Sequence, residues 1–236
     1  MNKITTNLNR LKCNKQKTLF LARKALPELV CDVVNLEGIN YTLPEVITLL
    51  DGVTVGGKKQ RDELIANNQI KAWKLLFELV EDETFRVDKK TVCILHKAVA
   101  KEEALTYGKF RNSGVFIAGT DYLPPQAVLL DEIWQQEMPT LHDNTNAGIY
   151  RCAISLFLQM ARNQFFFDGN KRTGRLAMNG VLLSRGLPII NLPAKRQLEF
   201  NQLMLDFYVS NNEKPMQDFM LSCLDEKVIT IMMEVN

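Results

Sequence analysis

The sequence predicts a mainly α protein, a helical domain that carries one small β-hairpin flap. Apolar residues recur at helical spacing in three segments of the first half: 43–50, 60–79 and 88–101. Residues 148–166 are apolar on nearly every side, which is typical of a central, buried helix. Residues 108–125 differ, because they alternate β-branched and polar residues between glycines and end in a double proline, as expected for a hairpin.

The helices of the N-terminal half have recognisable boundaries. Residues 1–20 are polar, and we expect them to be frayed or loosely helical. The helix over 43–50 ends at a glycine-rich segment, and a long amphipathic helix follows over 60–79. In the helix over 88–101, His96 lies on the apolar side, so we interpret it as a packed, hydrogen-bonded histidine.

The C-terminal half is predicted to consist of helices joined by short loops. A helix over 173–186 ends at a glycine with a proline just beyond it. Two more helices are expected over 195–209 and 214–233, and we interpret the first of them as a core element. The predicted units are an N-terminal extension, a main domain and a C-terminal helical extension: 1–32, 33–210 and 211–236.

Composition and charge exclude several classes of protein. The 29 Lys and Arg residues nearly balance 27 Asp and Glu, and a net charge of +2 gives no case for generic nucleic-acid binding. No apolar run reaches the ~18 residues of a membrane helix, and the basic N-terminus lacks the apolar stretch of a signal peptide. The five cysteines form no CxxC pair, so no zinc site or disulfide framework is predicted. We expect a cytoplasmic protein without nucleic-acid or membrane partners.

The segment 168–175, DGNKRTGR, has the composition of a phosphate-binding site. Gly169 allows the backbone to approach a ligand, and the N–H groups of the helix that follows can bind an anion. Arg172 and Arg175 share a helix face, and their guanidinium groups suit phosphate oxygens. Asp168 could hold a divalent cation together with phosphate and water. These residues predict a site for a Mg²⁺–nucleotide polyphosphate, and the alternative is a charged surface turn.

Several separated segments resemble the Fic family. The segment FFFDGNKRTGR, 165–175, is similar to the family signature H-P-F-x-D/E-G-N-G/K-R-x-x-R. Residues 36–59 resemble the N-terminal segment of Fic proteins that have an inhibitory helix, and 108–125 resemble their flap. Residues 175–188 are similar to the helix after the signature. The resemblance covers roughly residues 33–210 and implies a Fic fold and a bacterial protein.

The resemblance also implies an activity. Typical members transfer AMP from ATP to a hydroxyl group of a target protein, so ATP and Mg²⁺ are the expected cofactors. By position, Asp168 would coordinate Mg²⁺, and Arg172 and Arg175 would hold the distal phosphates. The anion hole would be formed by Gly169, Asn170 and Lys171. A lysine at this position also occurs in members resembling the Doc toxins, which phosphorylate their target, so it favours a kinase alternative slightly.

A target protein is the expected partner. The resemblance implies that the flap docks the target by strand-like pairing, through the residues around Arg111, Val115 and Ile117. The sequence does not identify the target or the transferred group. It also leaves the oligomeric state open, with a homo-oligomer as one alternative.

An inhibitory segment is expected at 33–38. The family motif S/T-x-x-x-E-G/N is matched by Glu37 and Gly38, whereas Val33 stands where Ser or Thr is expected. The resemblance implies that Glu37 pairs with Arg175 and keeps the γ-phosphate from its productive position. A carboxylate can do this because the site is partly closed and the pairing geometry is bidentate. The alternative is that Glu37 is a surface acid.

The signature histidine, which is the general base of the family, is missing. Gln164 occupies its position and Phe165 the next. A glutamine cannot take a proton at physiological pH, but it can orient a hydroxyl group. Loss of a general base costs about 10²–10⁴-fold in rate, and positioning and charge neutralisation remain for phosphoryl-type chemistry. We interpret His142 as a loop histidine.

Three hypotheses follow. The first is a Fic-type nucleotidyltransferase, restrained by Glu37, in which Gln164 is a weak substitute for the base. The second is a pseudo-enzyme that binds nucleotide as a regulatory ligand and transfers nothing. The third, a protein-interaction scaffold, requires that ATP does not bind at all. Removal of Glu37 distinguishes the first two, because it should release transfer activity in the first alone.

Overall fold

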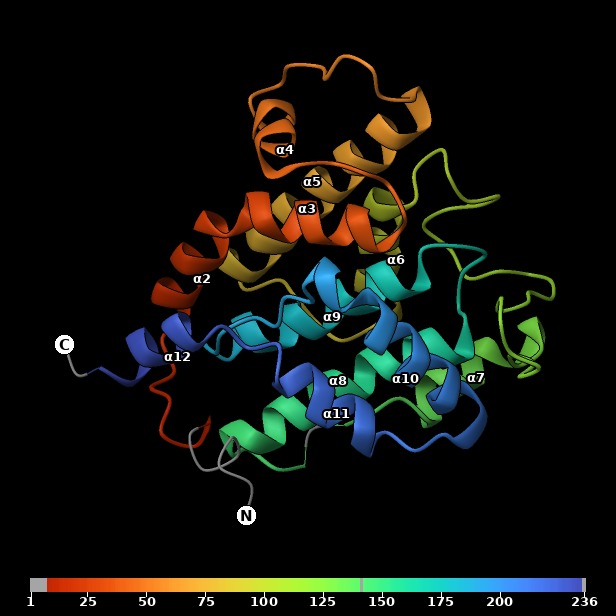
Figure 1. Ribbon diagram of the computed structural model, residues 1–236. Helices are drawn as coiled ribbons and strands as arrows, with labels where there is room; N and C mark the ends of the chain where they lie inside the picture. The colour runs from red at the N-terminus through yellow and green to blue at the C-terminus, as the bar shows by residue number, and fades with distance from the viewer. Residues whose placement is uncertain (1–7, 141, 235–236) are drawn as a thin grey trace.

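In the computed structural model, which describes residues 8–140 and 142–234, helices surround a buried central pair, α8 and α9 (Figure 1). The first half of the chain contributes α2 (Lys15–Lys24), α3 (Leu26–Leu36), α4 (Leu43–Leu50), α5 (Gln60–Glu81), α6 (Lys89–Val99), the short 3₁₀ turn η1 (Ala127–Leu129) and α7 (Leu130–Gln136). The second half contributes α8 (Asn146–Asn163), α9 (Asn170–Ser184), η2 (Ala194–Arg196), α10 (Gln197–Ser210), α11 (Lys214–Leu221) and α12 (Glu226–Met233). The prediction of a mainly α fold is confirmed.

The central pair connects the apolar clusters of the protein. α8 and α9 share the most extensive helix–helix interface among the described residues. Neighbouring positions of α9 enter different clusters, with Leu176 facing α3 and α5, Ala177 facing α6 and α7, and Met178 facing α10 and α11. Helix α9 is therefore buried around most of its circumference. The loop between α8 and α9 is consequently held on a rigid base.

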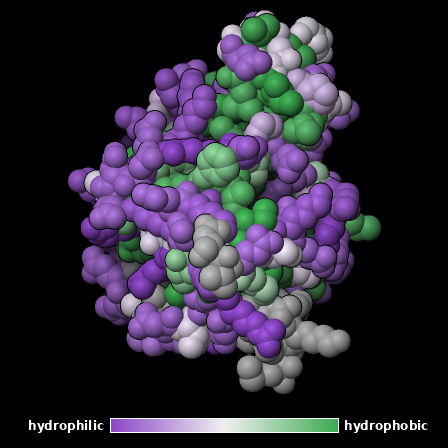
Figure 2. Space-filling view, turned by 90° about the vertical axis from the view of Figure 1, so that its left-hand side faces the viewer, coloured by the Kyte–Doolittle hydropathy of each residue, from purple (hydrophilic) through white to green (hydrophobic). Residues whose placement is uncertain are grey.

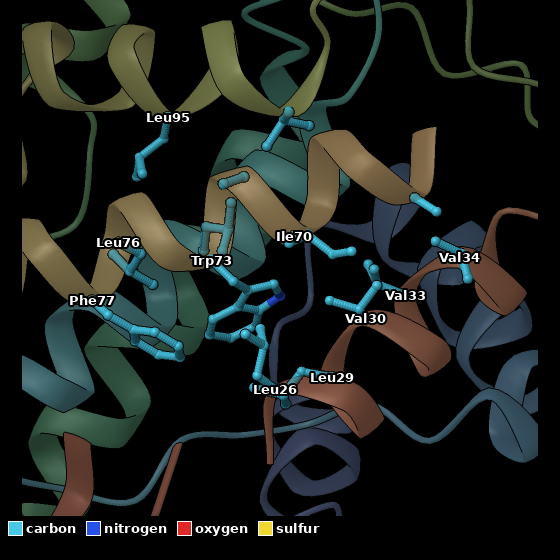
Figure 3. Packing of buried hydrophobic residues seen from close by; sticks show 14 of the residues in the cluster. Leu26, Leu29, Val30, Val33, Val34, Ile70, Trp73, Leu76, Phe77 and Leu95 are labelled. Atoms are coloured by element: carbon cyan, nitrogen blue, oxygen red, sulfur yellow. The ribbon is translucent and has the colours of Figure 1, made fainter. Parts of the chain in front are cut away.

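Helix α3 lies across α5 and is fixed there by a regular apolar stripe (Figure 3). Its buried residues recur at the spacing of one helix face: Leu26, Leu29, Val30, Val33 and Val34. Trp73 of α5, which is 5% exposed, packs against this stripe. Val33, the position where the inhibitory motif has Ser or Thr, is thus part of the core. The packing carries the end of α3 toward the loop between α8 and α9.

Two expectations for the ends of the chain are wrong. The expectation of a frayed segment over 1–20 fails from Leu8 onward, because Leu8 and Leu11 are buried and Asn14 caps α2 by accepting a hydrogen bond from Lys17 N. Residues 1–7 lie outside the described residues. The few leucines among the polar residues are enough to anchor the segment. The single helix expected over 214–233 is two helices, because Asp225 caps the start of α12 and interrupts the run.

The predicted β-hairpin flap is also wrong in its secondary structure. Residues 108–125 are all described and include no strand. Instead of a strand ladder, one side chain joins the two arms: Arg111 donates from Nη1 to the carbonyl of Ser113 and from Nη2 to that of Pro125. Two adjacent prolines lack the N–H groups that a ladder needs at this end. The flap is therefore an irregular loop anchored by side chains.

The side of the molecule that carries α2 and α12 is mostly hydrophilic (Figure 2). Apolar surface gathers at its upper end, where α4 lies in Figure 1 and where Leu43, Ile47 and Val53 are exposed. Across residues 8–140 and 142–234, no helix combines the length and apolar character needed to cross a membrane.

Candidate functional site

A cavity of about 450 Å³ lies beside the loop between α8 and α9. It brings together segments far apart in the sequence: Glu37 at the end of α3, 116–118 of the flap, 164 and 167–172 of the loop and the start of α9, and 201–208 of α10. All motif residues from Asp168 to Arg172 line it, whereas Arg175 lies deeper, beneath Glu37. The cavity is polar at the motif and apolar at Phe116, Met204 and Leu205.

The position of Glu37 is set by the way α3 ends. Gly38 has φ +77°, and its N–H donates to the carbonyl of Asn35, while Ile39 N donates to Val34 O. These two bonds form a Schellman motif, for which glycine is preferred because of the left-handed conformation. Ile39 and Val34 are both buried, which is the apolar contact that accompanies the motif. Gly38 thus places Glu37 at the rim of the cavity.

Glu37 lies between the two arginines of the motif. One carboxylate oxygen is 3.8 Å from Arg175 Nη2, and the other is 3.8 Å from Arg172 Nε. The Glu37 side chain is 26% exposed, whereas those of Arg172 and Arg175 are 4% and 9% exposed. The structure therefore brings together the predicted inhibitory acid and the predicted phosphate-binding arginines.

Arg175 has unused capacity for a ligand. Among the described residues its buried Nε finds no hydrogen-bond partner. Burial lowers the pKa of Arg175 to about 10, against the attraction of Glu37, so the group remains charged at neutral pH. A buried cation with one distant partner is unfavourable by itself and would be stabilised by an anion.

The start of α9 has the geometry of an anion site. Gly169 adopts φ +71°, and a Cβ atom there would lie 3.3 Å from Val99 Cγ1, so glycine suits both the backbone and the space. No side chain caps the first turn of α9, all of which is described. Its N–H groups can bind an anion from the cavity.

Asn170 braces the loop with its side chain. Its Oδ1 accepts a hydrogen bond from Phe166 N, and its Nδ2 donates to Phe166 O and to Gln164 Oε1. The residue is 3% exposed. Because these bonds use both ends of the amide, its side chain supports the loop, and its backbone N–H is the part that remains for a ligand.

Gln164, at the position of the missing base, has a constrained side chain. It ends α8 in the left-handed conformation, with φ 49°. Its Nε2 donates to Ala161 O at 2.6 Å, and its Oε1 accepts from Asn170 at 2.9 Å. The side chain lines the cavity but has no group that can accept a proton.

His96 is a structural histidine, as its place on the apolar side predicts. Its ring stacks on Phe166 with centroids 3.7 Å apart. Nδ1 accepts from Gly108 N, which assigns the proton to Nε2, and Nε2 lies 3.0 Å from Asp168 O. Burial lowers the pKa of His96 to about 4, so the neutral ring joins the base of the flap to the motif loop.

The predicted docking residues of the flap differ in their surroundings. Arg111 is 3% exposed, and besides the flap carbonyls its Nε donates to Gln164 O. Val115 is half-buried, and Ile117 lines the cavity and packs toward α10. Phe116 between them is 88% exposed. Arg111 therefore anchors the flap from beneath, and among residues 115–117 Phe116 is the exposed side chain.

The carboxylate of Asp168, which lines the cavity, suits a nucleotide-bound magnesium ion. The side chain of Asp168 is 55% exposed, and its Oδ1 accepts from Gly169 N and lies 3.6 Å from Arg172 Nη2. The described residues contain no cluster of three or more His, Cys, Asp or Glu side chains. Mg²⁺ is commonly held by one or two carboxylates with substrate phosphates and water, so Asp168 fits this role. When bound, the ion would offset phosphate charge.

Lys171 is the third cation of the cavity. Burial lowers its pKa; the nearby Arg175 and Arg172 lower it further, and Glu37 opposes them. Lys171 lies in the first turn of α9 and lines the cavity. Lys171 therefore adds a further positive charge near the two arginines that Glu37 contacts.

Comparison with known proteins identifies the family of the segment that contains the motif loop. Residues 86–182 match the sequence model of the Fic/DOC family. The chain carries a Fic domain. The matched segment runs from before α6 to α9 and includes His96, the flap and the motif loop, whereas Glu37 lies outside it.

Relatives of the Fic domain are adenylyltransferases by name. The chain is 23% identical over 200 residues to "Protein adenylyltransferase Fic" of Drosophila melanogaster, and 22% identical over 211 residues to that of Drosophila ananassae. The matches cover 82% and 86% of this chain but 39% and 41% of the relatives, so the chain spans about two fifths of their length.

Solved structures share the fold. Fic-1 of C. elegans superimposes with a TM-score of 0.77 at 17% identity, covering 97% of this chain and 67% of that one. A Fic domain containing signaling protein from Bacteroides thetaiotaomicron gives a TM-score of 0.77 at 16% identity and covers 98% and 94%. These similarities show that the helical arrangement is the Fic fold.

Sequence reasoning missed one charged residue of the Fic site. Glu103, whose side chain is 3% exposed, accepts a hydrogen bond from Arg172 Nη1 at 2.7 Å. Its neighbour Glu102 is 61% exposed. Nothing in the segment KEEAL predicts which of these two acids is buried, because the difference in exposure arises from contacts of Glu103 with α5 and α9.

Proposed function

We propose that the cavity binds Mg²⁺–ATP and that the chain is an autoinhibited, Fic-type AMP transferase acting on a hydroxyl group of a target protein. One observation carries the proposal: Glu37 lies 3.8 Å from both Arg172 and Arg175, in the place where the motif would hold phosphate. The uncapped first turn of α9 and the unpartnered Nε of Arg175 support an anion as the natural occupant of that place.

In the proposed reaction the target hydroxyl oxygen forms a bond to the α-phosphorus, and the bond to the β-phosphate breaks. Pyrophosphate leaves, and the hydroxyl proton passes to solvent or to a phosphate oxygen. Arg172 and Arg175 would hold the distal phosphates, and Gln164 Oε1 would orient the hydroxyl group. In this reaction the rate enhancement would come from positioning of the reactants and neutralisation of phosphate charge, without a side chain that acts as a base.

Inhibition follows from the competition between Glu37 and phosphate. Both are anions that would bind the Arg175 guanidinium, so they would compete for it. The contacts at 3.8 Å are long for an ion pair and carry no hydrogen bond. Glu37 can therefore be displaced without loss of the fold, since α3 is fixed by its apolar stripe.

A second function is favoured by Gln164. Both ends of its amide are engaged, by Ala161 and by Asn170, so the group at the base position is held away from any proton transfer. This supports a nucleotide-binding module that produces no covalent product. The two functions share the cavity and differ in the outcome of one experiment.

The test is intact mass spectrometry after incubation with Mg²⁺ and ATP, together with calorimetric titration of Mg²⁺–ATP. Four proteins are compared: wild type, Glu37→Gly, Gln164→His and the double variant. Glu37→Gln serves as a control that removes the charge and keeps the side-chain length. We expect ATP affinity to rise at least about tenfold when the Glu37 charge is removed.

The outcomes separate the proposals. A nucleotidyl adduct on Glu37→Gly with Gln164 present supports the transferase. An adduct on the double variant alone supports the nucleotide-binding module. Absence of ATP binding in all variants contradicts both and favours a protein-interaction scaffold.

A further inference from the structure

Arg172 has a second, closer carboxylate partner that does not line the cavity. Glu103, in the turn after α6, accepts from Arg172 Nη1 at 2.7 Å, whereas Glu37 and Asp168 lie at 3.8 and 3.6 Å. Glu37 and Asp168 line the cavity and Glu103 does not. The guanidinium group is therefore held on one edge and faces the cavity with Nε and Nη2.

Glu103 is itself fixed from behind by α5. Asn68, which is 1% exposed, donates from Nδ2 to Glu103 Oε1 at 2.9 Å and to the carbonyl of Lys101 at 2.8 Å. One carboxylate oxygen thus bonds Asn68 and the other bonds Arg172. A buried carboxylate with both oxygens bonded has little freedom to move.

The contrast with Glu37 indicates a different role. The Glu37 side chain is 26% exposed and makes long contacts, as a displaceable group would. Glu103 is 3% exposed and makes short hydrogen bonds. Although burial alone would lower the pKa of Arg172, the carboxylates of Glu37 and Glu103 raise it. When a ligand displaces Glu37, Glu103 remains in place.

We propose that Glu103 is a positioning residue that holds Arg172 in the orientation required for the nucleotide phosphates. The inference rests on the proposed binding of Mg²⁺–ATP. An arginine already fixed on one edge loses little side-chain freedom when phosphate binds its other edge. The chain Asn68–Glu103–Arg172 thereby links α5 to the phosphate-binding face of α9.

The test measures Mg²⁺–ATP affinity in the Glu37→Gly background, where competition from Glu37 is absent. Adding Glu103→Gln should weaken ATP binding about tenfold or more and leave the weaker binding of adenosine unchanged, because adenosine has no phosphate. Glu102→Gln, the exposed neighbour, is the matched control and should change neither. Asn68→Ala loosens Glu103 without altering its charge and should weaken ATP binding in the same direction.

A double-mutant cycle shows whether Glu103 acts through Arg172. With Arg172→Gln present, Glu103→Gln should cause no further loss of ATP affinity. Thermal unfolding gives an independent readout. Arg172→Gln leaves a buried acid without its partner, so the added Glu103→Gln should restore part of the lost stability.

Each outcome bears on the inference. Unchanged or tighter ATP binding by Glu103→Gln, with Glu37→Gly itself binding ATP, overturns the positioning role and leaves the proposed function intact. An equal loss of adenosine binding also overturns it, because the effect would then be a general distortion. If Glu37→Gly binds no ATP, the proposed function fails and the inference fails with it.

Discussion

Replacement of His96 should change how stability depends on pH. The neutral ring accepts from Gly108 N through Nδ1 and donates to Asp168 O through Nε2, and it stacks on Phe166. A protonated ring would turn the Nδ1 acceptor into a donor that faces the Gly108 N–H. Protonation is therefore incompatible with the contact that joins the flap to the motif loop.

The size of the effect follows from the pKa. Burial lowers the pKa of His96 from 6.5 to about 4, and one unit corresponds to about 1.4 kcal/mol. The unfolded state binds the proton first as pH falls, so the free energy of unfolding decreases between pH 6.5 and about 4. Between pH 7.5 and 5.0 the loss attributable to His96 should be about 2 kcal/mol.

The assay is urea unfolding at these two pH values, for wild type and for two variants that cannot titrate at this position. The variant His96→Asn can keep an acceptor for Gly108 N, and His96→Gln can keep a donor to Asp168 O. Both should be less stable than wild type at pH 7.5 and lose about 2 kcal/mol less than wild type on acidification. His142→Gln, at an exposed histidine, controls for the loss of a histidine. Equal pH dependence of wild type and both variants would refute the assignment of a neutral His96.

Three further predictions concern the scaffold of the site. Gly180→Ala would place a Cβ atom against the ring of Phe85 and should cost about 1–3 kcal/mol in urea unfolding. Gly114→Ala, with nothing within 4 Å of its Cβ, should be nearly neutral, and equal stability of the two variants would contradict this packing. In Arg111→Lys the single ammonium group cannot span the carbonyls that the guanidinium joins, so the free energy of unfolding should fall by about 3 kcal/mol and amide exchange in the flap should accelerate. Unchanged amide exchange at 112–125 would argue against the anchoring role of Arg111. Asn14→Ala removes the cap of α2 and should lower the free energy of unfolding by about 1 kcal/mol, and an unaltered urea midpoint would show that the cap is dispensable.

Local patterns in the sequence were sufficient for several elements. The helix over 43–50 is α4 with the expected bounds, because Thr42, Pro44 and Glu45 form a complete start signal. The loop before α9 ends at Gly169, which adopts the left-handed conformation that glycine favours, and α9 begins at Asn170. Helix propensity, caps and apolar spacing act over one or two turns, so they can be read from neighbouring residues.

The flap shows what cannot be predicted from neighbouring residues in the sequence. Alternation and glycines in 108–125 are compatible with a hairpin, yet a strand needs a partner for its N–H and C=O groups. In the flap the carbonyls of Ser113 and Pro125 instead accept hydrogen bonds from Arg111, whose position depends on Gln164 at the end of α8. A side chain that bonds the backbone in place of a neighbouring strand produces no periodic pattern in the sequence.

What the sequence by itself determined is the helical fold class, the Fic motif and the candidate ligands within it, since these depend on residues close together in the chain. The tertiary structure alone decided that Glu103 is buried and Glu102 exposed, and that Glu103 meets Arg172 across 69 positions. It also placed Glu37 at 3.8 Å from both arginines through the packing of α3 on α5. Burial and ion pairing depend on which helices pack together, and that arrangement is a property of the whole core.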